Sequence, residues 1–127
     1  MTLLIELKEA VDASLLPHLE EPATLCRDAL ILRLNNGVIM ELRFASAEEY
    51  ALTWRYGDAE FRIDTAPVDH AVATSPHHLH DMNGQVYADP VTRPGATPLD
   101  NTRALIMAVL ADPLFERTGR DAARTVG

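Results

Sequence analysis

Four of the chain's five histidines, His70, His77, His78 and His80, lie between positions 67 and 81. Imidazole is the side chain that titrates nearest to neutral pH, and it is also a common metal ligand. The cluster is therefore consistent with a metal site, an acid–base site, or a polar loop whose imidazoles bond to the backbone or stack on an aromatic ring.

A metal site requires neutral imidazoles that converge on one point. In an extended chain His78 and His80 face the same way, whereas His77 faces the opposite way. A His-x-His pair places two ligands, and His70 or Asp69 could supply a third. No helical His-Glu-x-x-His motif fixes this geometry. The metal candidates are thus His70, His78 and His80, and we predict no cofactor.

An acid–base site would suit RNA cleavage. That reaction needs a base for the 2′-hydroxyl, an acid for the leaving 5′-oxygen and a cation for the phosphorane, and it requires no metal. His78 and His80 are the proton carriers in this hypothesis, with Arg55 or Arg62 beside the phosphate. The arginines also have an ordinary explanation, because cross-strand pairs such as Arg55 with Glu60 are typical of a solvated sheet face.

Two hairpins before the histidines would position these groups. In the first, "DALILRLNNGVIMELRF", a three-residue loop at 35–37 places Gly37 in a left-handed conformation and keeps all the leucines on one face. In the second, "YALTWRYGDAEFRID", a two-residue turn at 57–58 pairs Trp54 with Phe61. One face of the resulting meander is apolar, and the other carries arginines and acids.

Helices at both ends can cover the apolar face. Leucine and valine at spacings of three and four predict a helix over 3–15. Thr97 is expected to cap a last helix that begins at Pro98 and is stopped by Pro113. Both helices would pack on the same side of the sheet, because only that side is apolar.

Residues 65–98 show no periodicity and predict a long His/Pro-rich loop across or beside the sheet, with a short extra strand within 84–88. We therefore expect one α+β domain over 1–113. It would contain an antiparallel sheet of about four strands, with the N- and C-terminal helices packed on one face. A flexible tail over 114–127 would follow.

Composition restricts the function classes. A net charge of −8 disfavours binding to nucleic acid through bulk attraction, so any RNA contact must be local and DNA binding by this chain alone is not expected. The apolar runs are much shorter than the ~20 residues that span a bilayer, and the N-terminus lacks the features of a signal peptide. The single Cys26 cannot form an internal disulfide. We expect a cytoplasmic protein with no membrane partner.

The order of these features resembles the TumE-like family, small bacterial proteins that are candidate toxins of type II toxin–antitoxin pairs. The resemblance covers residues 1–113, and its most specific parts are "FRIDTAP" at 61–67 and "PHHLH" at 76–80. The chain departs from the family pattern at two places. Thr65 follows the aspartate where an asparagine is frequent, and Val68-Asp69 replaces a His-His pair.

The resemblance implies a toxin held by a cognate antitoxin, often a helix-turn-helix protein, whose basic surface would complement this acidic chain. Endoribonuclease activity is the candidate reaction. His78 and His80 would be the acid and base, Arg62 and Arg55 would clamp the phosphate, and Asp64 would orient an imidazole or pair with an arginine. The alternative is a non-catalytic protein-interaction module whose histidine loop is structural or binds a metal. The sequence leaves a homodimer open.

Overall fold

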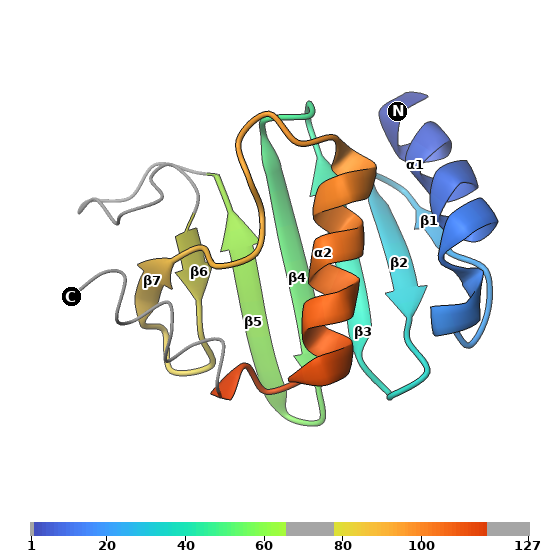
Figure 1. Cartoon of the computed structure of the whole chain (residues 1–127). Helices are drawn as coiled ribbons and strands as arrows, with labels where there is room; N and C mark the ends of the chain where they lie inside the picture. Colours follow the sequence, from blue (N-terminus) through green and yellow to red (C-terminus); the bar gives the residue numbers. More distant parts are fainter. Residues whose placement is uncertain (1, 66–77, 117–127) are drawn as a thin grey trace.

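The computed structural model describes residues 2–65 and 78–116, which form one antiparallel sheet with two α-helices (Figure 1). The seven strands lie side by side in chain order, so each described strand pairs with its neighbours in sequence. The elements are α1 (Thr2–Ser14), the short 3₁₀ helix η1 (Leu16–His18), β1 (Thr24–Cys26), β2 (Ala29–Arg33), β3 (Ile39–Phe44), β4 (Tyr50–Tyr56), β5 (Ala59–Asp64), β6 (His78–His80), β7 (Val86–Ala88) and α2 (Pro98–Ala111).

The two predicted hairpins are confirmed in their expected registers. β2 and β3 join through a loop in which Gly37 has a φ of +93°, a conformation that favours glycine. β4 and β5 pair Trp54 with Phe61 around Gly57, whose φ is +60°. A positive φ at the first turn residue alone is the geometry of a type II′ turn, which matches the twist of the flanking strands.

The expectation of about four strands is wrong, because the sheet has seven. The additional strands β1, β6 and β7 have three residues each, too few to show an alternating pattern in sequence. The histidine motif expected in a loop forms β6, which pairs with the edge of β5. The extra strand expected within 84–88 is β7. Backbone hydrogen bonds to an existing strand edge, rather than side-chain periodicity, create these short strands.

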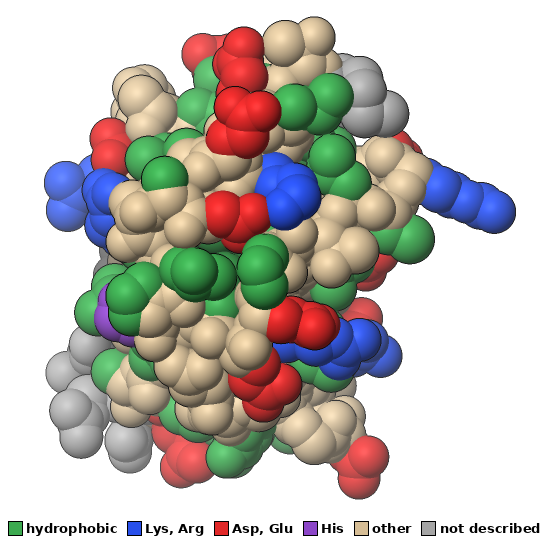
Figure 2. Space-filling view, turned by 90° about the vertical axis from the view of Figure 1, so that its right-hand side faces the viewer, with side chains coloured by type: hydrophobic (Ala, Val, Ile, Leu, Met, Phe, Trp, Pro, Cys, Tyr) green, Lys and Arg blue, Asp and Glu red, His purple; other side chains and the backbone are tan. Residues whose placement is uncertain are grey.

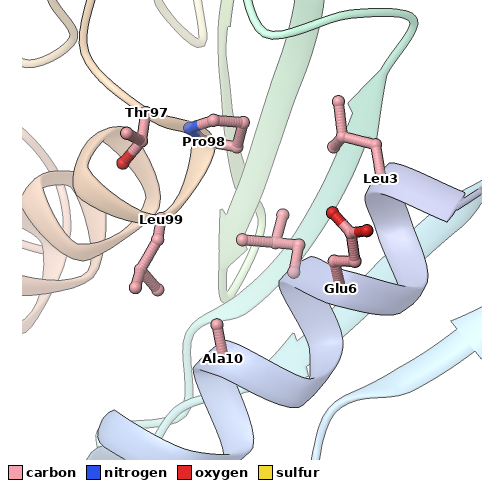
Figure 3. A pocket seen from close by; sticks show the side chains of 7 residues that line it. Leu3, Glu6, Ala10, Thr97, Pro98 and Leu99 are labelled. Atoms are coloured by element: carbon pink, nitrogen blue, oxygen red, sulfur yellow. The ribbon is translucent and has the colours of Figure 1, made fainter.

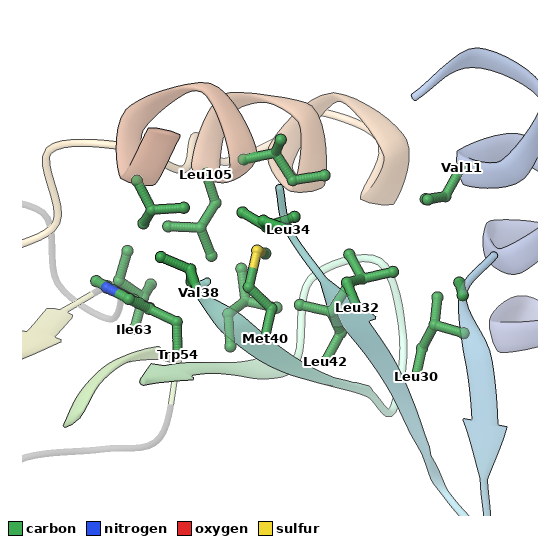
Figure 4. Packing of buried hydrophobic residues seen from close by; sticks show 14 of the residues in the cluster. Val11, Leu30, Leu32, Leu34, Val38, Met40, Leu42, Trp54, Ile63 and Leu105 are labelled. Atoms are coloured by element: carbon green, nitrogen blue, oxygen red, sulfur yellow. The ribbon is translucent and has the colours of Figure 1, made fainter. Parts of the chain in front are cut away.

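Both α-helices pack on the apolar face of the sheet, hereafter the covered face (Figure 1). Thr97 caps α2 as predicted, since its hydroxyl oxygen accepts a hydrogen bond of 3.1 Å from the amide of Asp100. The core extends along the chain to Phe115, whose ring lies 4.8 Å from that of Trp54. Figure 4 shows the buried side chains between the two α-helices and the strands, which include Val11, Leu30, Leu32, Leu34, Val38, Met40, Leu42, Trp54, Ile63 and Leu105.

The opposite face of the sheet, hereafter the polar face, presents the alternate side chains of the same strands. It carries Arg33, Arg43, Arg55, Arg62, Glu41, Glu60, Asp64, His78 and His80. None of the helices described in 2–65 and 78–116 packs against it. Neither α1 nor α2 combines the length and the apolar character required of a helix that crosses a bilayer.

Candidate functional site

Strand pairing between β5 and β6 assembles a cluster of ionisable groups on the polar face. Arg62 lies opposite His80, and Asp64 lies opposite His78. Because side chains alternate along a strand, these four residues share one face while Ile63 and its partner point into the core. The prediction that the two histidines face the same way is confirmed, and a strand rather than a loop provides their alignment.

The carboxylate of Asp64 is the centre of the cluster. Its Oδ1 lies 2.7 Å from His78 Nε2, and its Oδ2 lies 2.6 Å from Arg62 Nε. The same Oδ2 lies 3.6 Å from His80 Nε2, which is 3.3 Å from a terminal guanidinium nitrogen of Arg62. One buried acid therefore holds a cation and two imidazoles together, and its hydrogen bonds fix their relative orientation.

Burial divides the cluster into two halves. The side chain of His78 is 1% exposed and that of Asp64 is 8% exposed, whereas His80 is 22% exposed and Arg62 is 49% exposed. The rings of the two histidines are 4.7 Å apart and meet edge to face. His80 and Arg62 are thus the members that a ligand in solution can reach, and Asp64 and His78 support them from below.

The electrostatic surroundings of His80 favour its neutral form. Burial is the largest influence that lowers the pKa of its imidazole below the usual 6.5, and the positive charge of Arg62 adds to it. Asp64 opposes this shift but does not overcome it. If an N–H of Arg62 donates to Nε2, the neutral ring carries its proton on Nδ1. A neutral imidazole with a basic nitrogen beside a guanidinium can accept a proton near a bound anion.

A hollow of about 430 Å³ lies next to the cluster on the polar face. Its floor follows one row across the sheet, in which Arg43 lies opposite Ala51 and Ala51 opposite Asp64. The small side chain of Ala51 leaves space between the guanidinium and the carboxylate. Sequence reasoning missed Ala51, although strand alternation already placed it on this face. The lining residues are Arg43, Ala45, Glu49, Tyr50, Ala51, Asp64 and Thr65.

The same cluster offers a donor set for a metal ion. One ligand atom each from Asp64, His78 and His80 lies within 4.8 Å of the other two. Two imidazoles and a carboxylate suit zinc or a similar divalent cation. However, Arg62 is 2.6 Å from Asp64 Oδ2 and would place a positive charge against such an ion. The donor types fit a metal, whereas the position of Arg62 favours an anionic ligand.

Four of the five predicted catalytic residues meet in this cluster: Arg62, Asp64, His78 and His80. Arg55 does not join them, since it lies on β4 opposite Ile39 and Glu60. Within 2–65 and 78–116, no hydrogen bond or ion pair connects it to the histidines. The metal candidate His70, with Asp69 and His77, lies outside the described residues.

Comparison with known proteins connects this chain to one family. The family model described as "Toxin TumE" matches residues 3–114, which include every strand and helix described above except the first residue of α1. No curated protein and no solved structure gives a significant match. The match includes the whole Arg62–Asp64–His78–His80 cluster.

Proposed function

The chain belongs to the TumE toxin family, and we propose that it is a metal-independent endoribonuclease that acts as the toxin of a type II toxin–antitoxin pair. The observation that carries the proposal is the contact of 3.3 Å between a partly exposed imidazole, His80, and the guanidinium of Arg62. Cleavage of an RNA phosphodiester by its own 2′-hydroxyl requires a base that accepts the hydroxyl proton, and a neighbouring cation stabilises the charge that develops on the phosphate.

In the proposed reaction, Arg62 turns the N–H that contacts His80 Nε2 towards the phosphate, and the freed Nε2 takes the proton of the 2′-hydroxyl. The 2′-oxygen then forms a bond to phosphorus, and the bond between phosphorus and the 5′-oxygen breaks. The products are a 2′,3′-cyclic phosphate and a free 5′-hydroxyl, and water supplies the proton for the leaving oxygen. Arg62 stabilises the negative charge on the phosphorane.

We assign Asp64 and His78 to positioning. Asp64 bonds to Arg62 at 2.6 Å and to His78 at 2.7 Å, so it fixes the guanidinium against the sheet. His78 is too deeply buried to touch a substrate, because its side chain is 1% exposed. Its hydrogen bond to the buried carboxylate of Asp64 replaces part of the hydration that this group loses on burial.

Cleavage of a mixed-sequence RNA in excess EDTA tests this function, with a 2′,3′-cyclic phosphate as the expected product end. His80→Ala should lower the rate by about 10²–10⁴-fold, the usual contribution of a general base. His18→Ala is the matched control, because His18 is also partly buried but lies in η1, away from the cluster. Wild-type protein that leaves RNA intact, or that cleaves it only with added metal, refutes the proposal.

Metal binding is the second candidate, favoured by the 4.8 Å grouping of donors from Asp64, His78 and His80. Equilibrium dialysis of protein without an affinity histidine tag against Zn²⁺ tests it. One bound ion per chain that is lost in His80→Ala would establish the site. Stoichiometry well below one would eliminate it and would leave the anion-binding interpretation.

The antitoxin partner is proposed from charge and exposed apolar surface. On the side formed by α1 and β1, acidic side chains lie among apolar ones (Figure 2). Ile5 and Leu16 are 42% and 41% exposed there, and the chain has a net charge of −8. A basic protein with apolar anchors would complement this side.

A groove of about 180 Å³ lies between α1 and the start of α2 (Figure 3). It is the candidate binding site for an apolar side chain of the antitoxin. Its lining residues are Leu3, Glu6, Leu7, Ala10, Thr97, Pro98 and Leu99. Co-expression with the product of an adjoining gene should yield a complex that Glu6→Lys weakens. A complex that forms equally well with this variant would place the contact elsewhere.

Growth of cells that express the chain alone separates the toxin from a non-catalytic interaction module. We expect arrest with wild type and normal growth with His80→Ala at equal protein levels. Arrest by both proteins would indicate a toxin that acts by binding rather than by cleavage.

A further inference from the structure

A second hollow on the polar face lies two strands from the histidine cluster. It has a volume of about 240 Å³ and is formed by β2, β3 and β4. Strand register places Arg33 opposite Ile39 and Ile39 opposite Arg55, so two guanidinium groups stand on either side of one isoleucine. The lining residues are Ile31, Arg33, Ile39, Glu41, Thr53 and Arg55.

The acids near this hollow pair only weakly with its two arginines. Glu41 lines the hollow, but its carboxylate bonds to Arg43 at 2.8 Å. Arg55 has no ion pair within the described part of the chain, although Glu60 lies directly opposite it. Arg33 contacts Glu21 at 3.4 Å, and both side chains are about half exposed, so solvent weakens this pair. The two guanidinium groups are therefore available to an anion.

The hollow is aligned with the cluster. Thr53, on its wall, lies opposite Arg62 on β5, and Arg62 lies opposite His80 on β6. Neighbouring strands are about 4.8 Å apart, so the centre of the hollow is roughly 10 Å from the cluster across the strands. A flexible polyanion that crosses the sheet at right angles to the strands would meet both places.

We propose that this hollow binds a phosphate of a nucleotide that flanks the cleaved bond. The inference rests on the proposed function for the identity of the ligand as single-stranded RNA. Arg33 and Arg55 would hold the phosphate oxygens, and the hydroxyl of Thr53 would donate a further hydrogen bond. Guanidinium groups suit this task because their planar donor sets match phosphate geometry.

The lining also indicates which part of the RNA is recognised. None of the six lining residues is aromatic, and single-strand binders that hold bases do so largely by stacking them on aromatic rings. The hollow therefore recognises the backbone and not the base. Contacts to phosphate position a substrate without reading its sequence.

Two substrates isolate this subsite. A dinucleotide has only the phosphate that is cleaved, whereas an oligonucleotide of about ten residues also has flanking phosphates. The double variant Arg33→Ala plus Arg55→Ala should lower kcat/KM for the oligonucleotide by about tenfold or more and leave the dinucleotide unchanged. Arg103→Ala is the matched control, because Arg103 on α2 is 44% exposed, close to the 49% of Arg33. It should affect neither substrate.

Binding of the labelled oligonucleotide to His80→Ala protein separates this inference from the proposed reaction. Replacing both arginines should remove one phosphate contact. The slope of log affinity against log salt concentration should therefore become smaller in magnitude by about 0.7. Weaker binding with a lower slope supports the subsite even if no cleavage is ever detected. Unchanged binding, or an equal loss of activity on both substrates, overturns it.

Discussion

The two faces of the sheet are built from the same strands but hold their side chains by different means. On the covered face, Leu52 and Trp54 are fully buried and are fixed by close packing against neighbours from many parts of the chain. On the polar face, Arg62 and His80 are held by a few directional contacts to Asp64 and to each other. Packing distributes stability over many residues. In the polar cluster, by contrast, the positions of the other side chains depend on contacts with the single carboxylate of Asp64.

This difference indicates that substitutions on the covered face should affect stability and those on the polar face should affect chemistry. The division is incomplete at Asp64 and His78, which are buried although they lie on the polar face.

Two adjacent residues of β4 give the largest contrast. Leu52 is 0% exposed, and its neighbour Thr53 points to the polar face. Leu52→Ala should lower the free energy of unfolding by about 2–5 kcal/mol because it leaves a cavity in the core. Thr53→Ala should change it by no more than about 0.5 kcal/mol. Urea unfolding of the two variants measures the difference, and similar losses would contradict the division between the faces.

Replacing either histidine of β6 should lower activity, but the two substitutions should differ in their effect on the stability of the protein. His78→Ala removes the imidazole that bonds to the buried Asp64 carboxylate at 2.7 Å, with an expected cost of about 1–3 kcal/mol. His80→Ala should cost about 0.5 kcal/mol or less because this side chain is partly exposed. Chemical unfolding combined with the RNA assay separates the roles. If His78→Ala is as stable as wild type, its assignment to positioning fails.

Tyr50 is a polar exception within the core. Its hydroxyl donates to Thr92 at 2.7 Å, so Tyr50→Phe should cost about 1 kcal/mol of unfolding free energy. Burial raises the pKa of Tyr50 from 10.0 to about 12, so folding favours the neutral phenol. The difference in stability between wild type and Tyr50→Phe should therefore be constant below pH 10.0 and shrink as the pH rises towards 12. A difference that grows over this range would contradict the stated cause.

The smallest expected effect is a shift in the pH profile of RNA cleavage. The reaction needs neutral His80, so activity is present above its pKa and is lost as the pH falls through it. In wild type this acidic limb should lie below pH 6.5, because burial and the charge of Arg62 lower the pKa. Arg62→Gln removes that charge, so the limb of the residual activity should move to higher pH. Arg103→Gln should leave it in place, and an unmoved limb in Arg62→Gln would exclude His80 as the titrating base.

The local sequence predicted those helices and strands that are long enough to show a periodic pattern of apolar side chains. Alternation and turn glycines set both hairpin registers, since shifting either by one residue would move apolar side chains to the wrong face. Helical spacing and the Thr97 cap located α2. The same alternation placed Arg62 and Asp64 on the polar face, and the two-residue spacing of His78 and His80 required them to point the same way in an extended chain.

Only the tertiary structure decided that these two pairs meet. No local pattern indicates that His78–His80 is a strand, because a segment of three residues is too short to show the alternation of apolar and polar side chains that marks a strand. The segment becomes β6 by pairing with the edge of β5, and that register alone places His78 beside Asp64 and His80 beside Arg62. The separation of Arg55 from the histidines has the same origin. A residue's own strand fixes the face on which it lies, but its distance from a residue on another strand depends on pairing between distant segments.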